Sequence, residues 1–202
     1  MSVNLINIDQ HQYKLLYSDK QIETAIRSMA SRITDTLKND NPIIVIIMKG
    51  GVIPFSLLIK YLAFPLEISY LDLSRYGDDE TGSSIIWDKR PDHLFANRTI
   101  LLIDDILDEG ITLYEAIKEC YDMNASKVYT AVLGQKSKFR PLGLPQCDFF
   151  GLTFPDEFLI GCGMDYKQQY RNTKGIYFKY QTPTRLVSQS DNHINTSILP
   201  VE

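Results

Sequence analysis

One segment of the 202-residue sequence concentrates the side chains that could do chemistry, and it runs D-D-I-L-D-E-G-I-T from Asp104 to Thr112. An apolar run precedes it and a helical pattern follows it, so the segment stands where a buried strand gives way to a helix. Gly110 permits close backbone approach in the turn. Exposed amides of this turn, the Thr112 hydroxyl and the helix dipole together predict a cradle for an anion.

Three aspartates stand beside that cradle, and their charges would repel a bare phosphate. A sugar whose hydroxyls donate to the acids would resolve the conflict, and so would a divalent cation that bridges acids and phosphates. A ribose 5-phosphate meets both conditions, with its phosphate on the turn amides and its diol donating to Asp104 and Asp105. The alternative is that these two acids only cap a loop, as acids at strand ends commonly do.

A second candidate segment is Lys49-Gly50-Gly51, which directly follows the β-branched apolar run 43–48. A run that is apolar on both faces is typical of a strand buried in a parallel sheet. Ligands of open parallel sheets bind outside the carboxyl ends of the strands, so both segments stand where a ligand is expected. An isolated lysine would be interpreted as a solvated loop residue, but the two glycines after a buried strand favour a binding loop.

The elements that must position these segments alternate between strands and helices. Apolar spacing predicts helices over 18–38, 52–62 and 112–123, and strands over 43–48, 66–73, 98–103 and 127–133. A short return strand could form at 84–87, after the polar segment 74–82, which is expected to be a mobile loop. This alternation implies right-handed crossovers, so the expected fold class is α/β, with an open, mostly parallel twisted sheet flanked by helices.

The length favours a single domain over residues 1–202, with its core at about 40–135. The region 136–180 is rich in glycine, proline and aromatic residues, and short strands at most are expected there. Together with residues 1–17 it could form a small cap over the sheet. The polar tail 181–202 is expected to be loose.

The composition is that of an ordinary soluble globular protein, with 44% hydrophobic residues and a net charge of −4. This charge provides no general attraction to nucleic acid or to an anionic membrane, so neither is an expected partner. The spacing of the three cysteines and three histidines argues against a disulfide framework or a structural metal site. Neither a secretory signal nor a membrane-spanning run is visible, and the expected location is the cytoplasm.

Three motifs carry a resemblance to a known family. The stretch Ile103–Leu113 resembles the phosphoribosyl-diphosphate (PRPP) motif of type I phosphoribosyltransferases. Met48–Gly51 looks like the pyrophosphate loop of the hypoxanthine-guanine phosphoribosyltransferases. The C-terminal signature of that family is similar to three stretches here, Phe154–Gly161, Met164–Tyr166 and Tyr170–Asn172.

The resemblance implies the type I phosphoribosyltransferase fold, whose cap is called a hood, and a role in purine salvage. The implied reaction is the magnesium-dependent transfer of the 5-phosphoribosyl group from PRPP to N9 of hypoxanthine or guanine, with xanthine left open. The products would be IMP or GMP and pyrophosphate. Relatives are dimers or tetramers, so a homodimer or homotetramer is implied.

For the sugar and its phosphate, the resemblance implies that Asp104 and Asp105 hold the ribose hydroxyls. Asp108 would lie beside N7 of the purine, as a general base or proton partner while N9 attacks C1′. The amides of Asp108, Glu109, Gly110, Ile111 and Thr112 would bind the 5′-phosphate. Many relatives have threonine in place of Glu109, whose extra negative charge should cost phosphate affinity unless the side chain points away.

For the leaving group, the resemblance implies that Lys49, Gly50 and Arg171 contact the pyrophosphate. Relatives often have a cis peptide bond at this lysine. The implied magnesium ligands are Asp165, Asp104 and Asp105. Asp165 and Arg171 are six positions apart and could instead form a simple surface pair.

For the base, the resemblance implies that Phe158 stacks on the purine and that the Leu159 backbone reads its 2-position edge. Lys136 is the candidate donor to the purine 6-oxo group, with nearby Lys138 as the alternative. The segment 74–82 corresponds to the family's lid. Many relatives carry Ser-Tyr where this chain has Arg75-Tyr76, so Tyr76 is assigned to the lid and Arg75 could contact the pyrophosphate.

Two other functions are compatible with parts of the pattern. A signalling receiver domain also uses an acid pair, a third aspartate, a threonine and a lysine, but its acids are spread over separate strands. Here Asp104, Asp105 and Asp108 lie within five residues of one another. A non-catalytic relative that binds RNA would need a basic face, and the charge of −4 provides no support for one.

Overall fold

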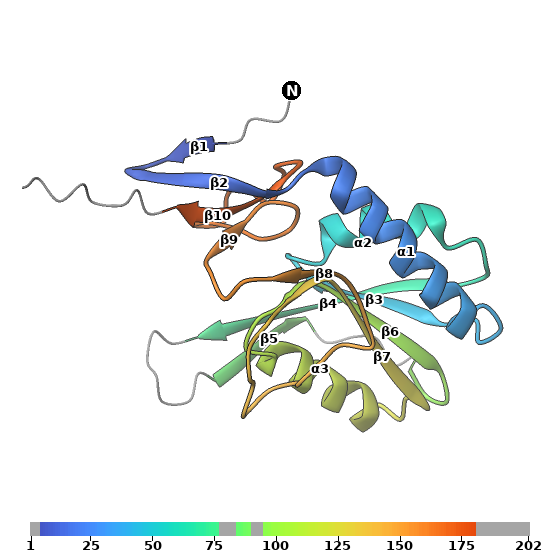
Figure 1. Cartoon of the computed structure of the whole chain (residues 1–202). Coiled ribbons are helices and arrows are strands. Elements are labelled where there is room, and N and C mark those ends of the chain that lie inside the picture. Colours follow the sequence, from blue (N-terminus) through green and yellow to red (C-terminus); the bar gives the residue numbers. More distant parts are fainter. Residues whose placement is uncertain (1–4, 77–83, 90–94, 181–202) are drawn as a thin grey trace, which may run out of the picture.

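The computed structural model describes residues 5–76, 84–89 and 95–180 as two sheets and the helices that pack on the larger one (Figure 1). The six-stranded sheet has the order β5-β4-β3-β6-β7-β8, in which β5 is antiparallel and all other neighbours are parallel. Its strands are β3 (Ile43–Met48), β4 (Glu67–Tyr76), β5 (Ser84–Lys89), β6 (Thr99–Leu107), β7 (Lys127–Lys136) and β8 (Phe149–Phe154). The expected α/β class with a mostly parallel sheet is confirmed.

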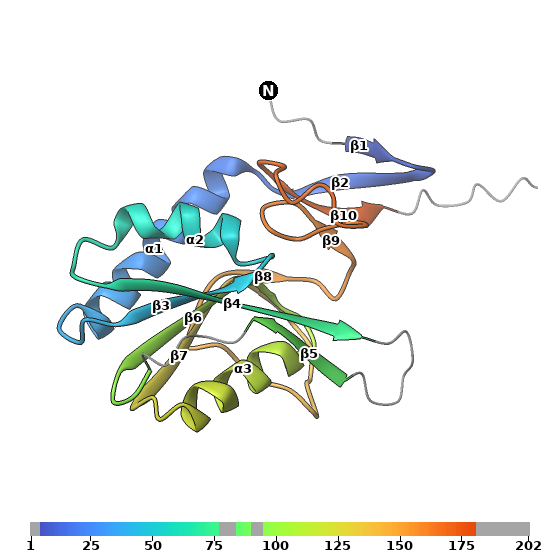
Figure 2. The same cartoon turned by 180° about the vertical axis from the view of Figure 1, so that it is seen from behind.

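Helices cover both faces of this sheet (Figures 1 and 2). They are α1 (Asp19–Leu37), α2 (Val52–Leu58) with the 3₁₀ turn η1 (Ile59–Tyr61), and α3 (Ile111–Asp122). Neighbouring residues of β3 show how the core divides: Ile44 packs in the cluster under α1 and α2, whereas Val45 packs in the cluster under α3. A strand buried on both faces therefore has the unbroken apolar run seen in the sequence.

A second, four-stranded antiparallel sheet forms the hood, in the order β1-β2-β10-β9. It consists of β1 (Leu5–Ile8), β2 (His11–Tyr17), β9 (Leu159–Ile160) and β10 (Ile176–Tyr180), and so joins the two ends of the described chain. The expected cap from N- and C-terminal segments is thus present. The tail 181–202 lies outside the described residues.

The helix predicted over 18–38 begins with the expected capping box, in which the backbone N–H of Ser18 donates to Gln21 Oε1 at 3.0 Å. All three cysteines are free and buried, and no helix within the described ranges is both long and apolar enough to cross a membrane.

Strand β8 corrects the expectation that all of 136–180 belongs to the cap, because it extends the main sheet beside β7. Gly151 lies within this strand. A Cβ at this position would lie 2.9 Å from the carbonyl oxygen of Leu133 and 3.4 Å from the Cβ of Ala25 in α1. The glycine therefore allows close packing of α1 on the edge strand.

Three strands also end later in the chain than the sequence predicted. β6 continues to Leu107, so Asp104 and Asp105 lie within the strand and not after it, because β7 pairs with β6 over this whole length. β7 itself reaches Lys136. Arg75 and Tyr76, expected in a mobile loop, pair with Ile85 and Ser84 of β5.

Candidate active site

The predicted site residues meet in a cavity of about 310 Å³ at the carboxyl ends of the parallel strands, beneath the hood. Segments that are far apart in the sequence contribute to its wall because β3, β6 and β7 are neighbours in the sheet. The predicted residues that line it are Lys49, Gly50, Asp104, Asp105, Asp108, Thr112, Lys136, Phe158, Leu159, Asp165 and Arg171. Lys138, the alternative to Lys136, is not part of this lining.

The predicted phosphate turn forms a second cavity of about 220 Å³, which shares Asp104, Asp105, Asp108 and Thr112 with the first. Glu109 and Gly110 line this smaller cavity. Gly110 has a φ of +76° and caps the N-terminus of α3, so the turn directs its amides ahead of a helix. Ile111 is the first residue of α3 and lines neither cavity.

The loop after β3 lies directly against the acids of β6. A Cβ at Gly50 would be 2.5 Å from Oδ2 of Asp105, so any other residue would displace this carboxylate. The peptide bond between Met48 and Lys49 is cis, as the resemblance implied. Lys49 and Asp105 are therefore on adjacent walls of the same cavity.

Asp104 and Asp105 are buried side by side, each with 8% of its surface exposed. The backbone N–H of Asp105 donates to Asp104 Oδ1 at 2.8 Å. Burial, together with the neighbouring Asp105 charge, raises the pKa of Asp104 well above its usual value. Burial also raises the pKa of Asp105, to about 6, although the Arg171 charge opposes the rise. Because both residues lie within β6, they do not cap a loop. Each carboxylate is costly to keep ionised without a cationic or hydrogen-bonding partner.

Arg171 connects two of the predicted acids. Its guanidinium contacts Asp165 Oδ1 at 2.6 Å and lies 3.8 Å from Asp105 Oδ2. A third contact, to the carbonyl oxygen of Gly163 at 2.7 Å, fixes its orientation. The pair with Asp165 is thus part of the cavity wall and is not a simple surface pair.

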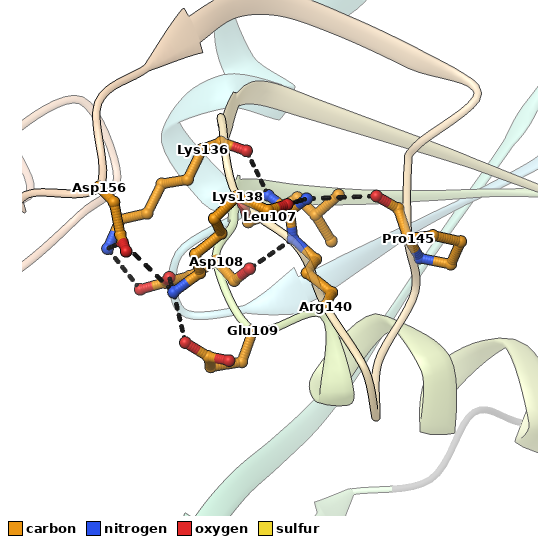
Figure 3. A network of polar contacts seen from close by, with 8 residues as sticks. All are labelled: Leu107, Asp108, Glu109, Lys136, Lys138, Arg140, Pro145 and Asp156. Atoms are coloured by element: carbon orange, nitrogen blue, oxygen red, sulfur yellow. Dashed lines mark hydrogen bonds and ion pairs between the residues drawn. The ribbon is translucent and has the colours of Figure 1, made fainter.

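Asp108 lies between two lysines (Figure 3). Lys136 contacts its Oδ2 at 2.8 Å and Lys138 contacts its Oδ1 at 2.6 Å. Burial alone would raise the pKa of Asp108, but the hydrogen bonds and charges of the two lysines outweigh it and lower that pKa. Asp156 completes the cluster, 3.4 Å from Lys136 and 3.3 Å from Lys138.

Arg140 is a residue that the sequence analysis did not single out. Its side chain is buried, and its guanidinium donates to five backbone carbonyls around the site (Figure 3). The acceptors and distances are Asp108 at 2.6 Å, Leu107 at 2.9 Å, Lys136 at 2.5 Å, Lys138 at 3.1 Å and Pro145 at 3.2 Å. Arg140 therefore ties the end of β6 to the end of β7. A lone arginine in a Gly- and Pro-rich loop has no sequence pattern that reveals this role.

The predicted purine platform lies on the hood side of the cavity. Phe158 is 48% exposed, which leaves a ring face available for stacking. Tyr166 meets it edge-on, with ring centroids 6.1 Å apart and an interplanar angle of 83°. The hydroxyl of Tyr166 donates to Asp9 Oδ2 at 3.0 Å, which connects the platform to the turn between β1 and β2.

Comparisons with known proteins show the family to which this chain belongs. A family model described as the phosphoribosyl transferase domain matches residues 12–167. The chain belongs to the phosphoribosyltransferase family. It is 30% identical to the hypoxanthine-guanine phosphoribosyltransferase of Bacillus subtilis over 79% of this chain and 88% of that protein. It is 25% identical to the hypoxanthine-guanine-xanthine phosphoribosyltransferase of Tritrichomonas foetus, over 79% and 87% of the two chains.

A solved structure shows the same fold as this phosphoribosyltransferase. The hypoxanthine phosphoribosyltransferase of Staphylococcus aureus superposes with a TM-score of 0.77 at 26% identity. The match covers 83% of this chain and 91% of that one. The sheet, its flanking helices and the hood are therefore those of the family.

The first residues of the predicted lid, 74–76, belong to the main sheet. The backbone of Arg75 and Tyr76 forms the end of β4. Residues 77–82 of the predicted lid lie outside the described residues.

The donor set of this phosphoribosyltransferase fits a magnesium ion. Among the described residues, no three side chains of His, Cys, Asp or Glu converge as a ready-made metal site. Magnesium, however, is commonly held by one or two carboxylates together with water and substrate phosphates. Asp104 and Asp105 are buried acids with raised pKa values, and Asp165 lines the same cavity, so their oxygens suit such an ion.

The raised pKa of Asp105 predicts how the ligand-free phosphoribosyltransferase responds to pH. A carboxyl that binds its proton more tightly when folded stabilises the protein at low pH, and this contribution is lost as pH rises from about 4 to about 6. Relative to the Asp105→Asn variant, wild type should lose up to about 2 kcal/mol of unfolding free energy across this window. Urea unfolding in EDTA at several pH values measures it. If the unfolding free energies of wild type and Asp105→Asn changed with pH in parallel, the raised pKa of Asp105 would be contradicted.

The hydrogen bonds of Arg140 predict that its replacement destabilises the folded protein. Replacement by methionine should lower the free energy of unfolding by about 3 kcal/mol, because several buried carbonyls lose a charged donor at once. The control is Arg98→Met, which loses an ion pair with half-exposed Glu67 at 2.8 Å and one hydrogen bond to the Asn41 carbonyl at 2.8 Å, and this change should cost about 1 kcal/mol. Denaturant midpoints for both variants make the comparison. Equal losses of unfolding free energy would show that Arg140 contributes no more to stability than Arg98 does.

Proposed function

We propose that this protein transfers the 5-phosphoribosyl group of PRPP to N9 of hypoxanthine or guanine, with xanthine as a third candidate base. The products are IMP or GMP and pyrophosphate, so the role is purine salvage. The observation that carries the proposal is the meeting of four predicted parts in one cavity: the loop at Lys49, the acids of β6, the turn before α3 and the aromatic Phe158. The names of the two relatives given above describe reactions of this class.

The sugar phosphate is bound by the turn and the acid pair. The amides from Asp108 to Thr112 point ahead of α3 and suit a 5′-phosphate. Asp104 and Asp105 accept hydrogen bonds from the ribose hydroxyls, which supplies the partners that these buried acids need. They also favour positive charge on the ribose ring as its bond to pyrophosphate breaks.

The purine lies between Phe158 and Lys136. Phe158 stacks on the ring, the backbone of Leu159 reads the 2-position edge, and Lys136 donates to the 6-oxo group. Lys136 can serve because it lines the cavity with a side chain only 10% exposed, whereas Lys138 does not line it. Recognition of the 2-position by backbone groups leaves the choice among hypoxanthine, guanine and xanthine open.

Positively charged side chains bind the leaving pyrophosphate. Lys49, Gly50 and Arg171 hold it, and all three line the cavity, with Arg171 paired to Asp165. A magnesium ion held by Asp165, Asp104 and Asp105 would supply further neutralisation of the phosphate oxygens when bound. Asp108 accepts or holds the proton at N7 while N9 attacks C1′. The segment with Arg75 and Tyr76 closes over the site and excludes water.

The remaining parts of the proposal concern the whole chain. Residues 1–202 form one phosphoribosyltransferase domain that works in the cytoplasm as a homodimer or homotetramer, without nucleic acid or membrane partners. The RNA-binding alternative finds no support among the relatives compared above, which are described as enzymes.

A spectrophotometric assay tests the proposal. Purified protein is incubated with PRPP, magnesium and each of hypoxanthine, guanine and xanthine in turn. Turnover with at least one base that ceases in EDTA is the expected result. Salt-dependent RNA binding without any turnover would instead favour the non-catalytic alternative.

A further inference from the structure

The phosphate turn of this chain contains an acid where an anion is expected to bind. Glu109 lines the smaller cavity together with Gly110 and Thr112. An unpaired carboxylate there would repel a phosphate across a few ångströms. The structure shows how that charge is balanced.

Lys138 is the partner of Glu109. Its ammonium is in direct contact with Glu109 Oε1, and it also contacts Asp108 Oδ1 at 2.6 Å and Asp156 Oδ1 at 3.3 Å (Figure 3). Burial opposes the charged form, but these hydrogen bonds raise the pKa of Lys138 above its usual range. The cluster therefore holds three acids against two lysines, and without Lys138 it would hold three against one.

Lys138 is held in place and is not a solvated surface lysine. Its side chain is 17% exposed, compared with 63% for Lys118 on α3. Its carbonyl oxygen accepts a hydrogen bond from Arg140 at 3.1 Å, and the same guanidinium binds the carbonyl oxygen of Asp108 at 2.6 Å. The backbones of Lys138 and Asp108 are thus fixed by one common group.

The two oxygens of Asp108 have different partners. Lys138 contacts Oδ1, whereas Lys136, the proposed purine ligand, contacts Oδ2. When Lys136 turns to a purine 6-oxo group, Oδ2 becomes available and Oδ1 stays held. Lys138 thereby orients the carboxylate without touching the base.

We propose that Glu109 and Lys138 form a matched positioning pair, in which Lys138 neutralises the phosphate turn and holds Oδ1 of Asp108 so that Oδ2 faces the purine. This inference rests on the proposed function and deepens it. It assigns a role to two residues that contact neither the purine nor the pyrophosphate in that scheme. It also explains why an acid is tolerated in the turn.

Binding of GMP and of guanosine separates the two effects of the pair. In Lys138→Met, the unpaired Glu109 should weaken GMP binding about tenfold, while guanosine, which has no phosphate, binds as in wild type. In the double variant Glu109→Gln/Lys138→Met, most of the GMP affinity should return. The kcat should stay reduced in both, because Oδ1 of Asp108 has lost its partner in each. Isothermal titration at low salt and steady-state assays provide the two readouts.

Matched controls accompany these variants. Lys118→Met removes a lysine that pairs with Glu115 at 3.9 Å on the exposed surface, and it should change neither readout. Lys138→Arg keeps the charge and should retain GMP affinity. Glu109→Gln alone should bind GMP as tightly as wild type or more tightly, and this sign can be scored even if Lys138→Met does not fold.

The possible outcomes distinguish this inference from the proposed function. Wild type that binds neither GMP nor PRPP would overturn the proposed function itself. Wild type that binds GMP, with unchanged affinity in Lys138→Met, would overturn the pair alone. Weaker GMP binding in Glu109→Gln, or no recovery in the double variant, would also refute charge matching.

Discussion

Replacement of Asp108 by asparagine should lower kcat by about 10²–10⁴-fold and leave PRPP binding within a few-fold of wild type, as expected when a general base is lost. Asparagine preserves the size of the side chain but cannot take a proton. The lysines at 2.8 and 2.6 Å keep Asp108 ionised in the free protein, so it is ready to accept one. When Lys136 moves to the purine, one of the contacts that lower the pKa of Asp108 is removed, and the carboxylate becomes a better base.

Steady-state kinetics with hypoxanthine and PRPP measure this loss. Asp156→Asn is the matched control, since Asp156 contacts the same two lysines but lines neither cavity. Its kcat should fall far less than that of Asp108→Asn. Near-normal turnover in Asp108→Asn would remove Asp108 from the base role, and equal losses in the two variants would assign the effect to the lysines instead.

The local patterns of the sequence predicted most of the fold and the clustering of the candidate site residues. The apolar run 43–48 corresponds to β3, and the helical spacing of 18–38 corresponds to α1. Both elements were predictable because each pattern depends only on residues that are close together in the sequence. The clustering of Lys49, Asp104 and Asp108 was also predictable, since parallel strands bring their carboxyl ends to one edge of a sheet.

Features that depend on long-range packing were not predictable. The sequence did not show that β6 continues past Asp104 and Asp105, because acids usually end a buried strand and only pairing with β7 extends it. That β8 joins the main sheet was not predictable either, because it depends on pairing with β7 and on the close approach of α1 at Gly151. The roles of Arg140 and Asp156 depend on partners that are distant in the chain, with no fixed spacing between them.

Replacement of Arg171 by methionine should lower kcat/KM for PRPP by about 10²–10³-fold, the size typical for a lost group that stabilises developing negative charge. Two effects add. The pyrophosphate loses a guanidinium, and Asp105 and Asp165 lose the cation that lies 3.8 and 2.6 Å away. Since the Arg171 charge is the largest of the effects that oppose the raised pKa of Asp105, that pKa should rise further in the variant.

Product inhibition separates leaving-group binding from a general disturbance of the cavity. Pyrophosphate should inhibit Arg171→Met much more weakly than wild type, while GMP, whose proposed phosphate site is the turn before α3, should bind almost equally. Arg171→Lys should recover only part of the activity, because one ammonium cannot reproduce the fork that reaches both Asp165 and the Gly163 carbonyl. Unchanged inhibition by pyrophosphate would place the leaving group elsewhere, and Arg171 would then serve only to balance the charge of the two acids.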